Sequence, residues 1–346
     1  MSYSEEQLSQ YFAHLGYDPR ADPTRPAGWL ESDRLGFLTE LQARQVARVP
    51  FESLSLHYSA ANPPLSLDLQ DLFRKIVHEG RGGYCMELNA FFGAVLRGLG
   101  FTLIGAGARV MGPNGVFLGW NHHLNLVSIN GTRYMVDVGY GKGGSFSPVP
   151  LDRTAAERER GLEFEPVSGT RGRLEYKRLE AHSDPTQRIW VYSTLRSPGT
   201  TVAEEKKEER EGEGPSWRPR YCFSELEYLP ADYEVMNYHA MTHPDSYFVK
   251  TVLAVRTILQ EEPREGDADT GSYGQSGGGG VQPRAKGTIV LHKDEVKQTV
   301  YGKSVLLERL SSEEQRIRAL EKYFGLVVSP EQAVCIKGRQ SEIRPE

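Results

Sequence analysis

Cys85 has the sequence setting of a nucleophile. It follows the segment Arg81-Gly82-Gly83-Tyr84 and stands at the predicted start of a helix, where unpaired backbone N–H groups and the helix dipole favour an anion. A thiolate at such a position can attack a carbonyl carbon and accept an acyl group. The alternative is a buried thiol that fills a gap in the core, as free cysteines often do. Considered alone, Cys85 fits this packing interpretation better.

A thiolate nucleophile needs a base, and the base needs a group that orients it. His122, His123 and Asp137 lie on two predicted strands joined by Asn130-Gly131, a strong signal for a two-residue hairpin turn. In the register of that turn, His122 and Asp137 are diagonal neighbours on one face, whereas His123 points to the other face. A three-residue turn would exchange the two histidines. The register therefore predicts His122 as the base and Asp137 as its partner.

Each of these residues also has a purely structural interpretation. A single histidine is usually a satisfied core or surface residue, and Asp137 could accept a hydrogen bond from the turn that ends its strand. The other histidines do not have metal-ligand spacing: His239 and His243 are four apart but lack the Glu of an HExxH motif. We therefore expect no metal site, and we expect Cys222 and Cys335 to be structural.

Hydrophobic periodicity predicts an α+β fold. Apolar residues three and four apart predict helices in the first hundred residues, over 6–15, 35–46, 67–78 and from 85 to about 98. Beyond residue 100 the period becomes two, which predicts strands over 102–110, 122–129, 134–138, 174–179, 188–193, 248–259 and 287–291. A last helix is predicted over 312–324 after a capping-box-like start. The strands of the middle region indicate a barrel or sandwich.

Two segments interrupt the pattern. Residues 203–218 form a charge run, and residues 261–286 contain the sequence GDADTGSYGQSGGGG. Both lack apolar periodicity, so we expect mobile insertions between strands, in preference to a regulatory or partner-binding tail.

Composition excludes several classes of protein. The 346 residues carry 41 Lys and Arg against 46 Asp and Glu, a net charge of −5, so a nucleic-acid partner has little support. Apolar runs stay far below the ~18–20 residues that span a bilayer, and the first residues do not have the pattern of a secretory signal. Three cysteines are too few for a disulfide framework. We expect a cytoplasmic protein without membrane contact.

Four segments occur in a fixed order: VPFESL at 49–54, RGGYCMELN at 81–89, GWNH at 119–122 and YMVDVGYG at 134–141. Together they resemble the VPFENL, active-cysteine, histidine and VDxGFG segments of the arylamine N-acetyltransferase family. The resemblance covers about residues 5–150 well and continues more weakly over 232–246 and 306–325. One departure is Tyr140, which stands where the family usually has Phe.

The resemblance implies a fold of three parts with a cysteine-protease-like triad. An N-terminal helical bundle over 1–100 would carry the active cysteine, a β-barrel over 101–225 would carry His122 and Asp137 together with the charged insertion, and an α/β lid over 226–346 would contain the glycine-rich insertion.

The same resemblance implies a role for each site residue. Cys85 would take the acyl group, His122 would be its ion-pair partner and proton shuttle, and Asp137 would orient His122. Phe51 and Tyr140 would line the acceptor pocket. Gly119 would lie near the place where coenzyme A enters.

The implied activity is ping-pong transfer of an acyl group from acetyl-CoA to an aromatic amine or hydrazine, as in xenobiotic metabolism. Enlarged chains of this kind resemble filamentous-fungal members, some of which prefer malonyl-CoA, so malonyl-CoA and propionyl-CoA are alternative donors. Two other interpretations remain. A papain-like or transglutaminase-like hydrolase would use the same triad with water as the acceptor, and a non-enzymatic scaffold would leave Cys85 inert.

Overall fold

A computed structural model describes residues 1–18, 20–21, 28–60, 65–158, 160–195, 216–260 and 284–344. The two predicted insertions therefore lie largely outside the described residues. Where their C-terminal ends are described, they are strands: Trp217 and Arg218 begin one strand, and Ala285 and Lys286 begin another. Both insertions thus end earlier than the sequence predicts.

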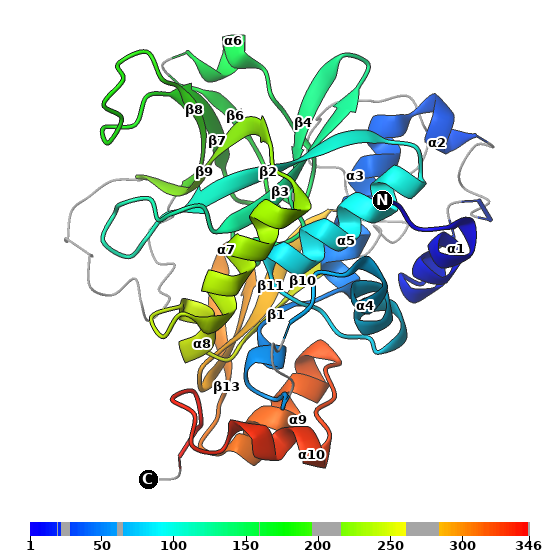
Figure 1. Cartoon of the computed structure of the whole chain (residues 1–346), viewed down its shortest axis with the longest axis vertical. Coiled ribbons are helices and arrows are strands. Elements are labelled where there is room, and N and C mark those ends of the chain that lie inside the picture. Colours follow the sequence, from blue (N-terminus) through cyan, green and yellow to red (C-terminus); the bar gives the residue numbers. More distant parts are fainter. Residues whose placement is uncertain are drawn as a thin grey trace.

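The N-terminal region is helical. It contains α1 (Glu5–His14), α2 (Trp29–Ser32), α3 (Arg34–Arg48), the short η1 (Leu54–Leu56), α4 (Leu69–Phe73), η2 (Arg74–His78) and α5 (Cys85–Gly98). The predicted helix over 67–78 is two pieces, because its second half has π-helical hydrogen bonding. Helix α5 is central (Figure 1). The buried rings of Tyr11 on α1 and Phe73 on α4 pack against Phe91 of α5.

An antiparallel eight-stranded sheet follows, in the order β5-β4-β3-β2-β9-β8-β7-β6. Its strands are β2 (Thr102–Val110), β3 (His122–Ile129), β4 (Thr132–Val136), β5 (Val149–Pro150), β6 (Leu162–Phe164), β7 (Gly172–Lys177), β8 (Ile189–Leu195) and β9 (Trp217–Glu227), with α6 (Arg153–Ala156) between β5 and β6. The sheet curls into an almost closed, barrel-like form around buried side chains that include Leu124, Leu126, Trp190, Tyr221 and Phe223 (Figure 1). The α+β class is confirmed.

The C-terminal region is built on a second antiparallel sheet, in the order β1-β10-β11-β12-β13. Its strands are β1 (Phe51–Glu52), β10 (Leu253–Leu259), β11 (Ala285–His292), β12 (Glu295–Val300) and β13 (Lys303–Arg309). The helical elements around it are α7 (Pro230–Thr242), α8 (Tyr247–Lys250), α9 (Glu313–Phe324), α10 (Pro330–Ala333) and η4 (Val334–Ile336). The predicted strand over 248–259 is wrong in its first part, which belongs to α8.

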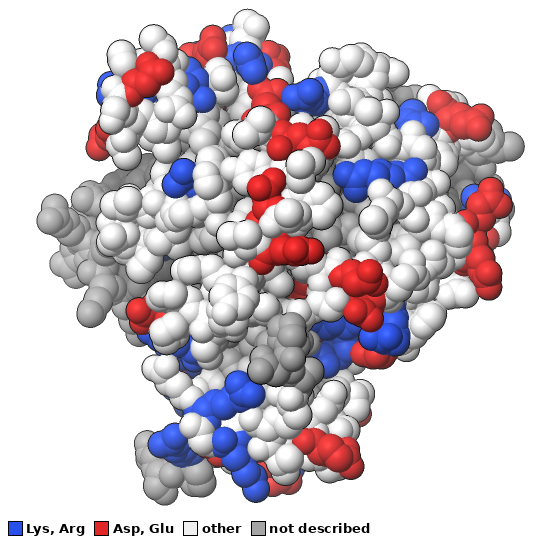
Figure 2. Space-filling view, viewed as in Figure 1, with Lys and Arg blue, Asp and Glu red and all other residues white. Residues whose placement is uncertain are grey.

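Strand β1 comes from the helical N-terminal region yet pairs with β10 at the edge of the second sheet, through Phe51 opposite Val255 and Glu52 opposite Ala254. The N-terminal and C-terminal regions are therefore joined by main-chain hydrogen bonds. On the face seen in Figure 2, Lys and Arg are interspersed with Asp and Glu over most of the surface. Among the described residues, no helix combines the length and the apolar character needed to cross a membrane.

Candidate active site

Cys85 is the first residue of α5, and the loop before it packs tightly against β1. A Cβ atom on Gly82 would lie 1.7 Å from the carbonyl oxygen of Pro50, and one on Gly83 would lie 2.5 Å from Glu87 Oε2. Two glycines are therefore required for the loop to lie this close to its neighbours. The Glu52 N–H donates to the Gly83 carbonyl over 2.8 Å, which attaches the cysteine loop to the second sheet.

The Glu52 carboxylate anchors the same loop. Its Oε1 accepts from Arg81 Nε and Nη2 over 3.1 and 3.0 Å and from the Gly82 N–H over 3.3 Å. Burial raises the pKa of Glu52, but the charges of Arg81 and Lys75 outweigh burial, so the pKa is lowered overall. Sequence reasoning missed this role. The signal in the sequence was a single carboxylate, Glu52, within the mostly apolar segment 49–54.

The hairpin that carries His122 and Asp137 has the register that the sequence predicts. Asn130 and Gly131 both have positive φ, 50° and 81°, and Ile129 pairs with Thr132, as in a two-residue turn. His122 Nε2 lies 2.7 Å from Asp137 Oδ2, and both side chains are buried. His123 points to the opposite face and stacks on Tyr233, with ring centroids 3.9 Å apart.

Cys85 joins this pair. Its Sγ lies 3.8 Å from the carbonyl oxygen of Asn121, the residue before His122, and its side chain interacts with the His122 ring. Gly139 allows the approach of α5 to the hairpin, because a Cβ there would lie 2.7 Å from Cys85 Cα. The structure therefore brings Cys85, His122 and Asp137 together and leaves His123 apart.

The buried charges distinguish the two histidines. Burial lowers the pKa of His122. The Asp137 carboxylate and Cys85 act in the opposite direction and together outweigh burial, so the pKa is raised to about 10. Burial also opposes ionisation of Asp137, yet His122 and hydrogen bonds from Asn89 and Gly139 hold the pKa of this carboxyl below its usual range. Burial and the neighbouring His122 charge lower the pKa of His123 to about 3. The pKa is therefore raised for His122 and lowered for His123, although both side chains are buried.

Asn89 holds the cysteine helix to the hairpin, and sequence reasoning assigned it no role. Its Nδ2 donates to Asp137 Oδ1 over 2.9 Å and to the His123 carbonyl over 2.7 Å, while its Oδ1 accepts from the Val138 N–H over 3.0 Å. The side chain is fully buried. It lies four residues after Cys85, so both face the same neighbour, and this spacing was the available signal.

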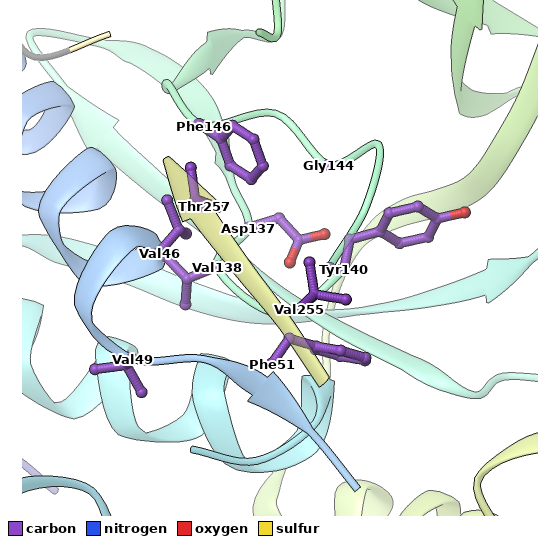
Figure 3. A pocket seen from close by; sticks show the side chains of 11 residues that line it. Val46, Val49, Phe51, Asp137, Val138, Tyr140, Gly144, Phe146, Val255 and Thr257 are labelled. Atoms are coloured by element: carbon purple, nitrogen blue, oxygen red, sulfur yellow. The ribbon is translucent and has the colours of Figure 1, made fainter. Parts of the chain in front are cut away.

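Phe51 and Tyr140 line a narrow cavity beside the Asp137 carboxylate, together with Val46, Val49, Val138, Gly141, Gly144, Phe146, Val255 and Thr257 (Figure 3). Its volume, about 10 Å³, is room for about one water molecule. The Tyr140 ring meets the His122 ring edge-on, with centroids 5.6 Å apart. Gly119 lies exposed on the loop before β3, where a Cβ would meet nothing within 4 Å.

Helices α7 and α8 cover the residue before Cys85. The Tyr84 hydroxyl donates to the side-chain oxygen of Asn237 on α7. The Tyr84 ring meets Phe248 on α8 edge-on at 4.9 Å, and Phe248 also contacts Phe51. Among the described residues, no three His, Cys, Asp or Glu side chains are grouped as a metal site would require.

Comparison with known proteins shows what the chain resembles. A family model described as N-acetyltransferase matches residues 34–262. The N-malonyltransferase FDB2 of Fusarium pseudograminearum is 33% identical over 316 residues, which cover 86% of this chain and 80% of the relative. The arylamine N-acetyltransferase of Mycolicibacterium smegmatis is 30% identical over 259 residues, which cover 73% of this chain and 77% of the relative.

Solved structures share the fold. The arylamine N-acetyltransferase from Mycobacterium abscessus superimposes with a TM-score of 0.69 at 21% identity, covering 97% of this chain and 95% of its own. The Mycobacterium marinum enzyme in complex with CoA superimposes with a TM-score of 0.64 at 21% identity, covering 97% of this chain and 99% of its own.

Proposed function

The chain belongs to the arylamine N-acetyltransferase family and is an acyltransferase, and from that premise we propose that it transfers a short acyl group from a coenzyme A thioester to an aromatic amine or hydrazine through a thioester on Cys85. The observation that carries the proposal is the buried contact of Cys85, His122 and Asp137. The relatives named above act with malonyl or acetyl groups, and the Mycobacterium marinum enzyme binds CoA.

In the resting site, the Asp137 carboxylate stabilises the His122 imidazolium, which in turn stabilises a thiolate on Cys85. The helix dipole of α5 favours the same negative charge, because Cys85 is the first helical residue.

In the first half-reaction, the Cys85 thiolate attacks the thioester carbonyl carbon of acyl-CoA. Backbone N–H groups at the start of α5 stabilise the oxyanion that forms. When the intermediate collapses, the bond to the coenzyme A sulfur breaks, and the leaving thiolate takes the proton of His122. The acyl group stays on Cys85, and His122 is left neutral.

In the second half-reaction, the amine nitrogen attacks the carbonyl carbon of the Cys85 thioester. Neutral His122 accepts the amine proton as the carbon–nitrogen bond forms. The carbon–sulfur bond then breaks, the amide leaves, and the thiolate–imidazolium pair is restored. Phe51 and Tyr140 line the acceptor side of the site, and Gly119 marks the side from which coenzyme A approaches.

The test is acylation of the enzyme without an acceptor. Acetyl-CoA, propionyl-CoA or malonyl-CoA should add one acyl mass to the wild-type chain and to Cys335→Ala, and an arylamine should remove it as the amide. Cys85→Ala should gain no acyl mass and should lose all but about 1% of the turnover. A steady hydrolysis of the thioester that added arylamine leaves unchanged would instead indicate the hydrolase.

A further inference from the structure

A β-bulge in β9 takes one arginine, Arg220, out of the alternation of its strand. Tyr192 on β8 pairs with Tyr221 on β9, but the next residue, Ser193, pairs with Pro219, so Arg220 is an extra residue on β9. An extra residue breaks the alternation of side chains and redirects the one at the bulge. The Arg220 side chain therefore need not point away from the face that the neighbouring Tyr221 occupies.

The contacts of Arg220 place it beside the loop that follows Asp137. Its Nε donates to Thr194 Oγ1 over 2.7 Å, and its backbone carbonyl accepts from the Tyr140 hydroxyl over 3.3 Å. A Cβ on Gly143 would lie 3.5 Å from the Arg220 Cζ, so the glycine-rich loop packs against the guanidinium. The group is half-buried and fixed at one nitrogen.

The rest of the guanidinium is available to a ligand. Within the described ranges, no Asp or Glu side chain forms an ion pair with Arg220. Its charge nevertheless acts on its surroundings: burial raises the pKa of Tyr140 and of Tyr192, and Arg220 opposes both rises. A cation that is partly removed from water is normally paired, because its desolvation is costly. The two Nη groups are free to bind an anion.

Two tyrosine rings beside Arg220 contact the proposed catalytic base. The Tyr140 ring stands edge-on to His122, and the ring of Tyr221, the residue after Arg220, lies 5.1 Å from it between centroids. Tyr140 therefore contacts both the proposed base and the backbone of Arg220, which places this arginine next to the residues around Asp137.

We propose that Arg220 binds a carboxylate of the substrate during acyl transfer. The inference rests on the proposed function and specifies its substrate class. The carboxylate has two possible sources: an acyl group that ends in a carboxylate, such as malonyl, or an aromatic amine that carries one, such as aminobenzoate. In either case the planar guanidinium can form two parallel N–H···O bonds with it.

The test compares carboxylated and uncharged substrates in wild-type enzyme, Arg220→Gln and Arg220→Lys. The donor arm measures kcat/KM for malonyl-CoA and acetyl-CoA with an uncharged aniline, and the acceptor arm measures it for aminobenzoate and aniline with acetyl-CoA. If the acyl group supplies the carboxylate, the effect should appear in the donor arm, and if the amine supplies it, in the acceptor arm. In that arm Arg220→Gln should lower the ratio of kcat/KM for the carboxylated substrate to kcat/KM for the uncharged one about tenfold or more. Arg220→Lys should restore part of that ratio. Arg188→Gln, which replaces an exposed arginine just before β8, should leave both ratios unchanged.

A second readout is independent of turnover. Malonate and benzoate ions should slow the alkylation of Cys85 by neutral iodoacetamide in the wild-type chain and should do so less in Arg220→Gln. If the wild-type chain transfers no acyl group, the proposed function is wrong, and this protection alone decides the role of Arg220. Unchanged substrate ratios together with unchanged protection would overturn the inference. If Arg220→Gln does not fold, Thr194→Val replaces it in the test. This variant keeps the Arg220 charge but removes the hydroxyl that accepts from its Nε. It should lower both the substrate ratio and the protection of Cys85.

Discussion

At the scale of residues, the proposed site depends on the different surroundings of two adjacent histidines. His122 faces a carboxylate and a cysteine, which raise its pKa to about 10 against the effect of burial. His123 stacks on Tyr233, and burial together with the charge of His122 lowers its pKa to about 3. The same residue type thus has a raised pKa on one face of a strand and a lowered pKa on the other.

Replacing each histidine by Gln separates these roles. His122→Gln removes the imidazolium opposite Cys85, so alkylation of Cys85 should require a higher pH. Because an ordinary thiol with a pKa of about 8.5 is only a few per cent thiolate at pH 7, the rate there should fall about tenfold or more. His123→Gln should leave the profile near that of the wild-type chain. The measurement is the pH dependence of Cys85 alkylation by iodoacetamide. A shift in His123→Gln alone would mean that the base is misassigned.

At the scale of elements, the site is the junction of α5 with the β3–β4 hairpin. The hairpin register could be predicted because Asn130-Gly131 fixes a two-residue turn, and a fixed turn fixes which side chains share a face. The meeting of Cys85 with His122 could not be derived from spacing, because it depends on long-range packing of Gly139 against α5.

The errors in the predicted elements have physical causes too. Strand β9 was missed because Pro219 and the bulge at Arg220 break its alternation. Strands β12 and β13 carry many polar or exposed side chains, so their apolar period is weak. The short helix α8 contains two aromatic residues and a β-branched one, Tyr247, Phe248 and Val249, which also favour strands. The bounds of α5 and β3 were close because glycines with positive φ follow their ends, Gly100 after α5 and Gly131 after β3.

Asn89→Ala tests the junction from the helix side. The change removes two donors and one acceptor and leaves Asp137 Oδ1, the His123 carbonyl and the Val138 N–H short of partners in a buried place. The free energy of unfolding should fall by about 3 kcal/mol. If Asn89 positions Asp137, the pH profile of Cys85 alkylation should also move to higher pH. A loss of stability with an unchanged profile would restrict Asn89 to a structural role.

Gly139→Ala tests the junction from the hairpin side. The new methyl group would meet Cys85 Cα at 2.7 Å and Asn89 Nδ2 at 2.6 Å, and neither can move without shifting α5. Overpacking of this kind should lower the free energy of unfolding by about 1–3 kcal/mol, and the rate of Cys85 acylation should fall with it. Gly119→Ala is the control, because a Cβ there meets nothing within 4 Å. Equal stability of the two variants would show that the contact is not tight.

At the scale of the whole molecule, the C-terminal tail is tied to the N-terminal region through buried polar contacts. His57, which follows η1, has Nε2 3.0 Å from the Thr251 carbonyl and Nδ1 2.8 Å from Ser341 Oγ. Nearby, the buried Arg316 on α9 contacts Glu313, the Tyr58 hydroxyl and the Ser341 carbonyl. Three segments distant in the sequence therefore meet at one uncharged imidazole, next to the segment that supplies Phe51 and Glu52 to the site.

Because His57 is buried without a charge, the free energy of unfolding should fall as the pH is lowered. Burial lowers the pKa of His57 to about 4, and the charges of Arg316 and Arg339 act in the same direction. The unfolded chain binds this proton below about pH 6.5, so stability is fully present above that pH and is lost as the pH falls toward 4. Between pH 7 and pH 5 the loss from His57 should be about 2 kcal/mol, measured by urea unfolding at both pH values. In His57→Gln that part of the loss should disappear, at the cost of a lower stability at pH 7, whereas the exposed His239→Gln should keep the wild-type dependence. The same acid loss in His57→Gln as in the wild-type chain would show that His57 is not the group that titrates.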